Sequence, residues 1–541
     1  MNPDNSFILS KKTAFYSYRI FYVVLLALGW STTVSGLLHA DITLPRVFSD
    51  NMVLQRDKPV PVWGKADPGE KITVTFADQK QTTTADENGA WQVTLDPLPA
   101  NKTPQSFVVS GKNKLTLQNV LVGEVWLCSG QSNMEWLVDK SANPDEEKAA
   151  ADFPEIRHFK VPRTSSAFPQ ADVKANWQIC SPSTVSGFTA VGYFFARELF
   201  QKLDVPIGLL HSSWGGTAIE VWMSPESVVA TPELSELNAK LFSQSSLSPE
   251  GKQRHDDYLA DLKKWIPATE EALSNGKPIT EPPTVPWPAG DNPQPTQLYK
   301  GMIHPLAPFA VRGALWYQGE SNGFEDIIYT TKLRALIGGW RTKWNQGDFP
   351  FYIVQISNYA KIDPARRDAG MNWAKLREAQ LKALEIANTG LAVTIDIGES
   401  EDIHPKNKQD VGKRLALWAL ADTYGKDITP SGPLYKSHRV EDGKIRISFD
   451  HSKNGLMIGK KEGLAPVAPD PASKLLWIEI AGEDRIFKPA EAVIEGAELV
   501  IFSSEVPAPV AARYAFIQDP AGANLYNNEG LPASPFRTDS W

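Results

Sequence analysis

The central part of the chain, roughly residues 119–428, alternates short apolar segments with amphipathic ones, and this alternation constrains the fold more than any other feature. The apolar segments predict strands over 122–128, 207–211, 313–317, 351–355 and 391–395. Between them, apolar residues recur at helical spacing, as Val191, Phe195, Leu199 and Leu203 do. Strands that are apolar on both sides and separated by helices are typical of a mostly parallel sheet covered on both faces. We therefore predict an α/β domain over 119–428.

The first predicted strand ends in a turn that presents a serine, within the sequence LCSGQSNM (127–134). Gly130 leaves room for backbone or substrate to approach closely. In open α/β sheets, ligands bind beyond the carboxyl ends of the strands. Ser132 therefore stands where a nucleophile would be expected. A second interpretation is that Ser132 caps the helix that follows, since serine is a preferred helix cap.

Three other predicted strands are followed by residues that suit acyl transfer. The second strand leads into HSSWGGT (211–217), whose two glycines leave backbone N–H groups open to an anionic oxygen. The third leads into QGESN (318–322), and the fifth into DIGESEDIHP (396–405), a carboxylate-rich loop with one histidine. Because the ends of parallel strands meet at one edge of a sheet, we expect a nucleophile, hydrogen-bond donors, a base and an acid to lie together there.

The segments on either side of this domain have the pattern of β modules. Over 41–118, apolar and polar residues alternate in short runs separated by turn residues, which predicts a small antiparallel β-sandwich. From 429 to 541 the same pattern returns and predicts a second β module. Within the α/β domain, 224–298 is an excursion that is first helix-compatible and then rich in proline. It is either a wall of the site or a solvated connector.

The first 40 residues have the pattern of a signal peptide. Lys11, Lys12 and Arg19 precede the apolar run 20–30, and small and polar residues follow up to Ala40. The run is too short to span a membrane stably. We predict cleavage after Gly36 or Ala40 and export to the periplasm or medium, with no membrane attachment after cleavage.

Charge and cysteine content narrow the class of protein. The net charge is −8, with 55 Lys and Arg against 63 Asp and Glu, and no basic run is present. Phosphate binding needs clustered positive charge, so we expect no nucleic-acid partner. The two cysteines, Cys128 and Cys180, are too few for a disulfide scaffold, although export would permit a bridge between them. The oligomeric state is left open.

Four motifs together resemble a known family. GQSNM (130–134), SSWGGTAIEVW (212–222), WYQGESN (316–322) and DIHP (402–405), in this order, are similar to the SGNH-type carbohydrate esterases and specifically to the sialate O-acetylesterase family. The resemblance implies a flavodoxin-like three-layer SGNH hydrolase domain, here flanked by all-β sandwich-like modules. It implies an enzyme that removes acetyl groups from sugar hydroxyls of a glycan or sugar substrate, without metal or cofactor.

The resemblance also implies roles for individual residues. Ser132 matches the nucleophile of the family and His404 matches its general base. Asp402 is the candidate for the acid that orients the histidine. Glu401 is the alternative, because in related esterases the acid often stands three residues before the histidine. His304 is a weaker candidate for the base, since it precedes the third strand.

Three residues match positions that stabilise the oxyanion in the family. Gly216 and Gln318 are the first two. Asn322 ranks below Gln318, because Ser321 and Asn322 stand where the wider superfamily has Asn-Asp. If the substrate is sialic acid, Arg377 on the helix after the fourth strand is a possible partner of its carboxylate.

The sequence leaves three functions to compare. The first is an exported serine esterase that acts on 9-O-acetylated sialic acid. The second is the same chemistry on an acetylated plant polysaccharide such as xylan. The third belongs to another class, a non-catalytic carbohydrate-binding protein in which the β modules bind glycan.

Overall fold

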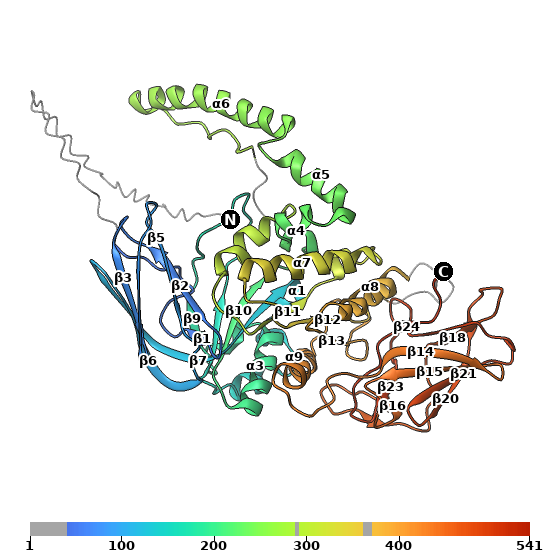
Figure 1. Ribbon diagram of the computed structural model, residues 1–541. Coiled ribbons are helices and arrows are strands. Elements are labelled where there is room, and N and C mark those ends of the chain that lie inside the picture. Colours follow the sequence, from blue (N-terminus) through green and yellow to red (C-terminus); the bar gives the residue numbers. More distant parts are fainter. Residues whose placement is uncertain (1–40, 287–291, 361–370) are drawn as a thin grey trace, which may run out of the picture. The chain divides into compact units, whose positions relative to one another are not determined.

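The long strand β7 (Lys114–Gly130) connects the N-terminal strands with the central parallel strands. This computed structural model describes residues 41–286, 292–360 and 371–541 (Figure 1). The predicted signal peptide lies outside the described residues. The first half of β7 pairs with the N-terminal strands, and its second half lies in the central sheet. The boundary placed at 118/119 from the sequence therefore falls inside one continuous strand.

The second half of β7 lies within a mostly parallel sheet. The strand order is β13-β12-β11-β7-β10-β8-β9, and every pair of neighbours is parallel except β8 and β9. The other six strands are β8 (Ile156–Lys160), β9 (Trp177–Ile179), β10 (Ile207–Ser213), β11 (Gly313–Tyr317), β12 (Phe351–Val354) and β13 (Thr389–Ala392). The predicted mixed α/β fold with a large central sheet is confirmed.

Helices cover both faces of this sheet (Figure 1). On one face, Trp126 and Tyr317 share a core with residues of α3 (Ala190–Leu203) and α9 (Lys408–Trp418). On the other face, Leu127 and Trp316 share a core with residues of α7 (Ile328–Trp344) and α8 (Met371–Leu381). Consecutive strand residues thus enter opposite cores, which explains why these strands are apolar throughout.

The N-terminal module is built of antiparallel strands. β3, β4, β6 and the first half of β7 form one sheet, β1 joins β7 in parallel, and β2 pairs with β5. Alternate residues of β3 and β5 are buried, as the period of two predicts. The bounds are β1 (Val53–Gln55), β2 (Val60–Lys65), β3 (Lys71–Phe76), β4 (Gln79–Thr84), β5 (Ala90–Leu95) and β6 (Asn101–Ser110).

The C-terminal part forms three antiparallel sheets, in the orders β14-β15-β21-β20, β17-β16-β23 and β19-β18-β22-β24. The last two strands in the chain lie in the segment 520–541, which is rich in Gly and Pro. The strands are β14 (Leu434–Glu441), β15 (Lys444–Asp450), β16 (Leu456–Lys460), β17 (Ala468–Pro469), β18 (Ile478–Ala481), β19 (Lys488–Pro489), β20 (Glu491–Glu495), β21 (Glu498–Phe502), β22 (Ala511–Tyr514), β23 (Leu525–Asn527) and β24 (Phe536–Arg537).

The excursion after β10 contains α4 (Pro225–Val229), α5 (Ser235–Gln244) and α6 (Pro249–Ser274). Helix α6 buries only Gly251 of its own residues and exposes apolar side chains such as Leu259 and Leu273. Two short helices, α1 (Ser132–Glu135) and α2 (Pro144–Ala149), follow β7. Within the described ranges, no helix is both long and apolar enough to cross a membrane.

Candidate active site

Ser132 and His404 meet at the carboxyl edge of the central sheet, although 272 residues separate them. The Nε2 atom of His404 lies 2.8 Å from Oγ of Ser132. Ser132 is the first residue of α1, directly after the turn that ends β7. That turn requires glycine at position 130, where φ is +138° and a Cβ atom would lie 2.1 Å from the carbonyl oxygen of Tyr317. Ser132 and His404 are therefore within hydrogen-bonding distance, as a nucleophile and its base must be.

Asp402 is the carboxylate that lies against the imidazole. Its Oδ1 atom is 3.5 Å from Nδ1 of His404 and accepts a hydrogen bond of 2.9 Å from the backbone N–H of His404. The side chain of Glu401, the alternative acid, is exposed. The ring of Trp136 stacks on the imidazole, with centroids 5.0 Å apart and planes at 13°. The histidine is thus held by a carboxylate at one nitrogen and an indole on its face.

The surroundings of His404 lower the pKa of its imidazole. Burial has the largest effect, because a charged imidazolium is poorly solvated there. The carboxylate of Asp402 opposes this and raises the pKa, whereas the ammonium groups of Lys408 and Lys140 lower it further. The pKa of His404 therefore lies below that of a free imidazole. At a pH where a free imidazole is already protonated, His404 is still neutral and can accept a proton.

This direction predicts the pH dependence of catalysis. The neutral imidazole is the reactive form, so kcat/KM should fall as the pH drops through the pKa of His404. Because that pKa is lowered, we expect the midpoint of the acid limb below about 6.5, the value of an unperturbed histidine. Initial rates with 4-nitrophenyl acetate across the acidic range measure it. A midpoint above 6.5 would mean that Asp402, rather than burial, controls the titration.

Two backbone amides beside Ser132 are free to bind an anionic oxygen. The N–H groups of Ser132 and Gly216 have no hydrogen-bond partner in the part of the chain that the structure describes. Gly216 has φ of +73° and is exposed, and its neighbour Gly215 lies against Ser132, where a Cβ atom on Gly215 would be 3.1 Å from Cβ of Ser132. The GG turn therefore lies next to the serine as the motif predicts.

A cavity of about 430 Å³ opens in front of the serine and the histidine. Arg163 lines this cavity and forms a bidentate ion pair with Glu135, with N···O distances of 2.8 and 2.6 Å. Its guanidinium lies 5.6 Å from the centre of the Trp214 ring. Glu135 also accepts a hydrogen bond of 2.9 Å from the N–H of Gly215. The lining residues are Ser132, Glu135, Trp136, Leu137, Lys140, Lys160, Arg163, Gly215 and His404.

The charged residues that line this cavity were not predicted from the sequence. Glu135 stands three residues after Ser132, one helical turn on, so its proximity could have been read from spacing. Lys140 lies in the segment after α1, whereas Lys160 ends β8 and Arg163 follows it by three residues, and none of the three carries a local sequence signal.

A sequence profile of the family described as "Carbohydrate esterase, sialic acid-specific acetylesterase" matches residues 122–277 and 285–421, which is more than half of the chain. This chain belongs to that family of carbohydrate esterases. The match covers the second half of β7 and the loop of His404. The family resemblance predicted from the four motifs is confirmed, and membership favours an enzyme over the non-catalytic carbohydrate-binding protein.

Known proteins similar to this esterase bear related names. The sialate O-acetylesterase of Mus musculus is 29% identical over 470 residues, which cover 80% of this chain and 82% of the mouse protein. The sialate O-acetylesterase of Rattus norvegicus is 31% identical, over 72% of this chain and 75% of its own. The crystal structure of a carbohydrate acetylesterase from Xanthomonas citri is 37% identical, with a TM-score of 0.75, over 93% of this chain and all of that one.

In this esterase, Gln318 and Asn322 do not offer a free side-chain donor to the cavity. The two amide protons of Gln318 face three acceptors, on Asn322 (2.7 Å), Gln131 (3.2 Å) and Thr217 (3.2 Å). The amide of Asn322 donates to Glu220 and Glu325. Both side chains are buried. They tie the loops after β7, β10 and β11 together, so among the three predicted oxyanion residues only Gly216 has an unpaired donor in the described structure.

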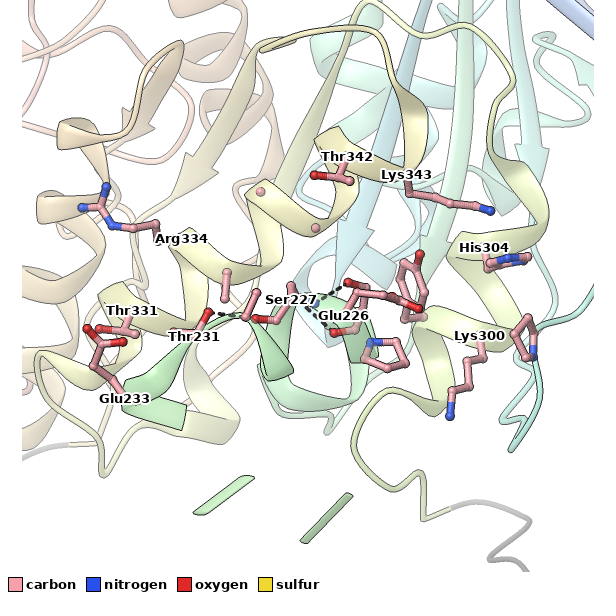
Figure 2. Close-up of a pocket in the computed structure, with 18 residues that line it drawn as sticks. Glu226, Ser227, Thr231, Glu233, Lys300, His304, Thr331, Arg334, Thr342 and Lys343 are labelled. Carbon is pink, nitrogen blue, oxygen red and sulfur yellow. Dashed lines mark hydrogen bonds between the residues drawn. The ribbon is translucent and has the colours of Figure 1, made fainter. Parts of the chain in front are cut away.

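His304, the weaker candidate for the base, lines a different cavity of the esterase, of about 730 Å³ (Figure 2). Figure 2 shows it near Lys300 and Lys343. Its Nδ1 atom lies 3.1 Å from the carbonyl oxygen of Gln170. The hydroxyl of Ser227 in the same cavity donates to the carbonyl of Ser224. Among the described residues, no serine hydroxyl is hydrogen-bonded to His304, so the arrangement of Ser132 and His404 is not repeated in this cavity.

Arg377 cannot meet a substrate carboxylate, because its side chain is completely buried. Its guanidinium donates to the carbonyls of Ile356, Ser357, Ile517 and Gln518 at 2.8–2.9 Å. It therefore fastens the C-terminal module to the end of β12. The sequence placed this cation near the strand ends but could not show that four carbonyls surround it.

Two further expectations concern cysteine and metal. Cys128 and Cys180 are both free and buried, so the optional disulfide is not formed. Burial raises the pKa of each thiol, to about 12 for Cys180. Over 41–286, 292–360 and 371–541, no group of three His, Cys, Asp or Glu side chains is arranged to hold a metal ion.

Proposed function

We propose that this esterase removes O-acetyl groups from sugars, with Ser132 as nucleophile, His404 as general base and Asp402 as the acid that orients the histidine. The observation that carries the proposal is the 2.8 Å contact between Nε2 of His404 and Oγ of Ser132. We further propose that the central sheet and its two helix layers form a flavodoxin-like SGNH hydrolase domain. The parallel strands and the position of Ser132 directly after β7 support this assignment.

In the first half of the reaction, His404 takes the proton of the Ser132 hydroxyl while Oγ forms a bond to the acetyl carbonyl carbon. The carbonyl electrons move to the oxygen, and the N–H groups of Ser132 and Gly216 stabilise the negative charge. When the carbonyl re-forms, the bond to the sugar oxygen breaks. His404 then gives its proton to that oxygen, and the sugar leaves with a free hydroxyl.

In the second half, water replaces the sugar. His404 takes a proton from the water, whose oxygen attacks the acetyl carbon of the acetyl-enzyme. The same two N–H groups stabilise the second tetrahedral intermediate. Its collapse breaks the bond to Oγ of Ser132, and the proton held by His404 returns to the serine. Acetate is released, and no step of this reaction requires a cofactor.

The charges of the cavity favour an acidic sugar. Lys140 and Lys160 line it, and their side chains are exposed. Neither has an ion pair in the described residues, whereas Arg163 is paired with Glu135. The ammonium of Lys140 lies 5.6 Å from the ring of Trp136, beside His404. We therefore place O-acetylated sialic acid ahead of acetylated xylan as the substrate, in keeping with the names of the mouse and rat relatives.

The test of the proposed function is acetate release from a panel of substrates. The panel contains 9-O-acetylated sialic acid, acetylated xylan and 4-nitrophenyl acetate. We expect release from all three, with the highest kcat/KM on the sialic acid. No release from any of them by the folded protein would contradict the proposed reaction, and a preference for xylan would contradict only the acidic substrate.

The variant Lys140→Ala tests the charge preference. Losing an exposed cation that faces the carboxylate of the substrate should cost about 1 kcal/mol in binding. This corresponds to about a fivefold rise in KM for acetylated sialic acid. For 4-nitrophenyl acetate, which carries no carboxylate, we expect KM to stay unchanged. Lys202→Ala, which removes an exposed lysine at the end of α3, is the matched control. Equal effects on both substrates would mean that Lys140 does not bind a carboxylate.

A further inference from the structure

A charged cluster lies buried directly beneath Ser132 and His404. Lys408, the first residue of α9, has no exposed surface, and its ammonium donates a hydrogen bond of 2.5 Å to Oδ1 of Asn133. The amide of Asn133 donates to Oε1 of Glu320, also at 2.5 Å. Oε2 of Glu320 is buried and has no hydrogen-bond partner within the described ranges. A lysine and a glutamate therefore share one asparagine in the interior.

Asn133 joins the two segments that carry the reacting groups. It follows Ser132 in the chain, and its Nδ2 atom donates a 3.0 Å hydrogen bond to the carbonyl of Ile403, the residue before His404. The distance between Oγ of Ser132 and Nε2 of His404 depends on how these two segments are held. The orientation of the Asn133 amide is fixed from the other side by Lys408, whose ammonium can bond only to the oxygen.

Lys408 also contacts the ring that supports His404. Its ammonium lies 5.7 Å from the ring of Trp136 and 5.4 Å from the ring of Tyr317, within the range of cation–π attraction. Trp136 in turn stacks on the imidazole of His404. The same ammonium thus reaches the serine segment through Asn133 and the histidine through Trp136.

The position of this lysine is costly. Lys408 has no ion pair with another described residue. Such burial disfavours a charged ammonium, and a cation at the beginning of a helix opposes the helix dipole. Burial lowers the pKa of Lys408 to about 7 and raises the pKa of Glu320. The charged groups that face Lys408 are Glu320 and, from the histidine loop, Glu399 and Asp402, all of which raise its pKa. Contacts with Asn133, Trp136 and Tyr317 offset this cost.

We propose that Lys408 is a positioning residue, which holds Asn133 and Trp136 so that the serine and histidine segments keep their reacting distance. The proposal rests on the proposed function, because it concerns the same Ser132 and His404. Lys408 does not touch the acetyl group and transfers no proton to it. Its charge acts on His404 at a distance and, with that of Lys140, favours the neutral imidazole.

The double variant Lys408→Met/Glu320→Gln tests this role. It removes both buried charges together and keeps the shapes of the side chains, so it should fold with little change in Tm, whereas Lys408→Met alone would leave Glu320 without an opposite charge. We expect kcat on 4-nitrophenyl acetate to fall about 10²-fold, because a misplacement of about 1 Å costs that much, with KM almost unchanged.

The second measurement is the pH profile of kcat/KM, which a purely structural role of Lys408 would leave unchanged. Removing a cation that lowers the pKa of His404 should shift the acid limb of kcat/KM to higher pH.

In Lys408→Ala, a primary alkylammonium ion added to the solution should restore part of kcat, and an alcohol of the same length should not. Lys461→Met is the control. It removes another lysine whose side chain is largely buried and whose ammonium lies 2.6 Å from a carboxylate oxygen of Asp410.

The outcomes separate this inference from the proposed function. Wild-type kcat and an unmoved acid limb in the folded double variant would overturn the positioning role, and so would failure of that charge-balanced variant to fold. If Ser132→Ala is inactive at the same time, the proposed function stands. If Ser132→Ala is active, the proposed function itself fails, whatever the lysine variants do.

Discussion

Ser132→Ala is expected to lower kcat on acetyl esters by about 10⁶-fold, as removal of the serine does in enzymes that use the same arrangement. In the proposed mechanism the hydroxyl of Ser132 forms the acetyl-enzyme, and among the described residues no other serine lies within hydrogen-bonding distance of His404. His404→Ala should cost about as much, because the serine is a poor nucleophile without its base. The double variant should be no worse than either, since the two residues act as one unit.

Ser129→Ala is the matched control for this series. Ser129 lies in β7, three residues before the nucleophile, and its buried hydroxyl has no hydrogen-bond partner in the described structure. We expect this variant to keep wild-type kcat. Acetate release is measured with purified, folded proteins. Substantial turnover by Ser132→Ala would rule out the assignment of the nucleophile, and inactivity of Ser129→Ala would show that the turn tolerates no change.

Asp402→Asn is expected to lower kcat by about 10²- to 10⁴-fold, because an amide would favour the wrong tautomer of His404 and would not stabilise the imidazolium. Solvent that weakens the contact between Asp402 and His404 would make the loss of kcat the smaller one, about 10²-fold. The Asp402 side chain is 44% exposed, and its oxygen lies 3.5 Å from Nδ1 of His404. The carboxylate raises the pKa of His404, so its loss should move the acid limb to lower pH. This shift is opposite to that expected for the lysine variant.

Glu401→Gln is the matched comparison for Asp402→Asn. It makes the same chemical change one residue away, on a side chain that is exposed. We expect nearly wild-type kcat and an unmoved acid limb. Measuring kcat and the pH profile of both variants decides which carboxylate orients the histidine. A large loss in Glu401→Gln with a small one in Asp402→Asn would reverse the assignment.

The sequence was sufficient for the parts of the fold that a short window of residues encodes. The five strands predicted in the central domain correspond to β7, β10, β11, β12 and β13, because residues that enter two opposite cores must all be apolar. Strand β8 was not predicted, since Arg157 and His158 interrupt its apolar pattern although both are buried. Their burial depends on neighbours that are distant in sequence, such as His211, 3.2 Å from His158.

The candidate site also contains residues that could be predicted from the sequence and residues that could not. Ser132, the GG turn and His404 could be predicted because each lies in the segment that follows a strand, and parallel strands bring their ends to one edge whatever the details of packing. The direction of a side chain was not predictable. Gln318 carries the amide that the motif requires, yet packing turns it toward Gln131 and Thr217 instead of the cavity.

The sequence by itself determined the class of fold, the order of the motifs and the candidate pair, Ser132 and His404. The tertiary structure decided which carboxylate lies at His404, which cations line the cavity, and that Lys408 lies under Asn133, 275 residues away in the chain. The physical reason is the range over which each property acts. Strand and helix patterns depend on a few successive residues, whereas a buried charge or a hydrogen-bond partner depends on which distant segments the packed core brings into contact.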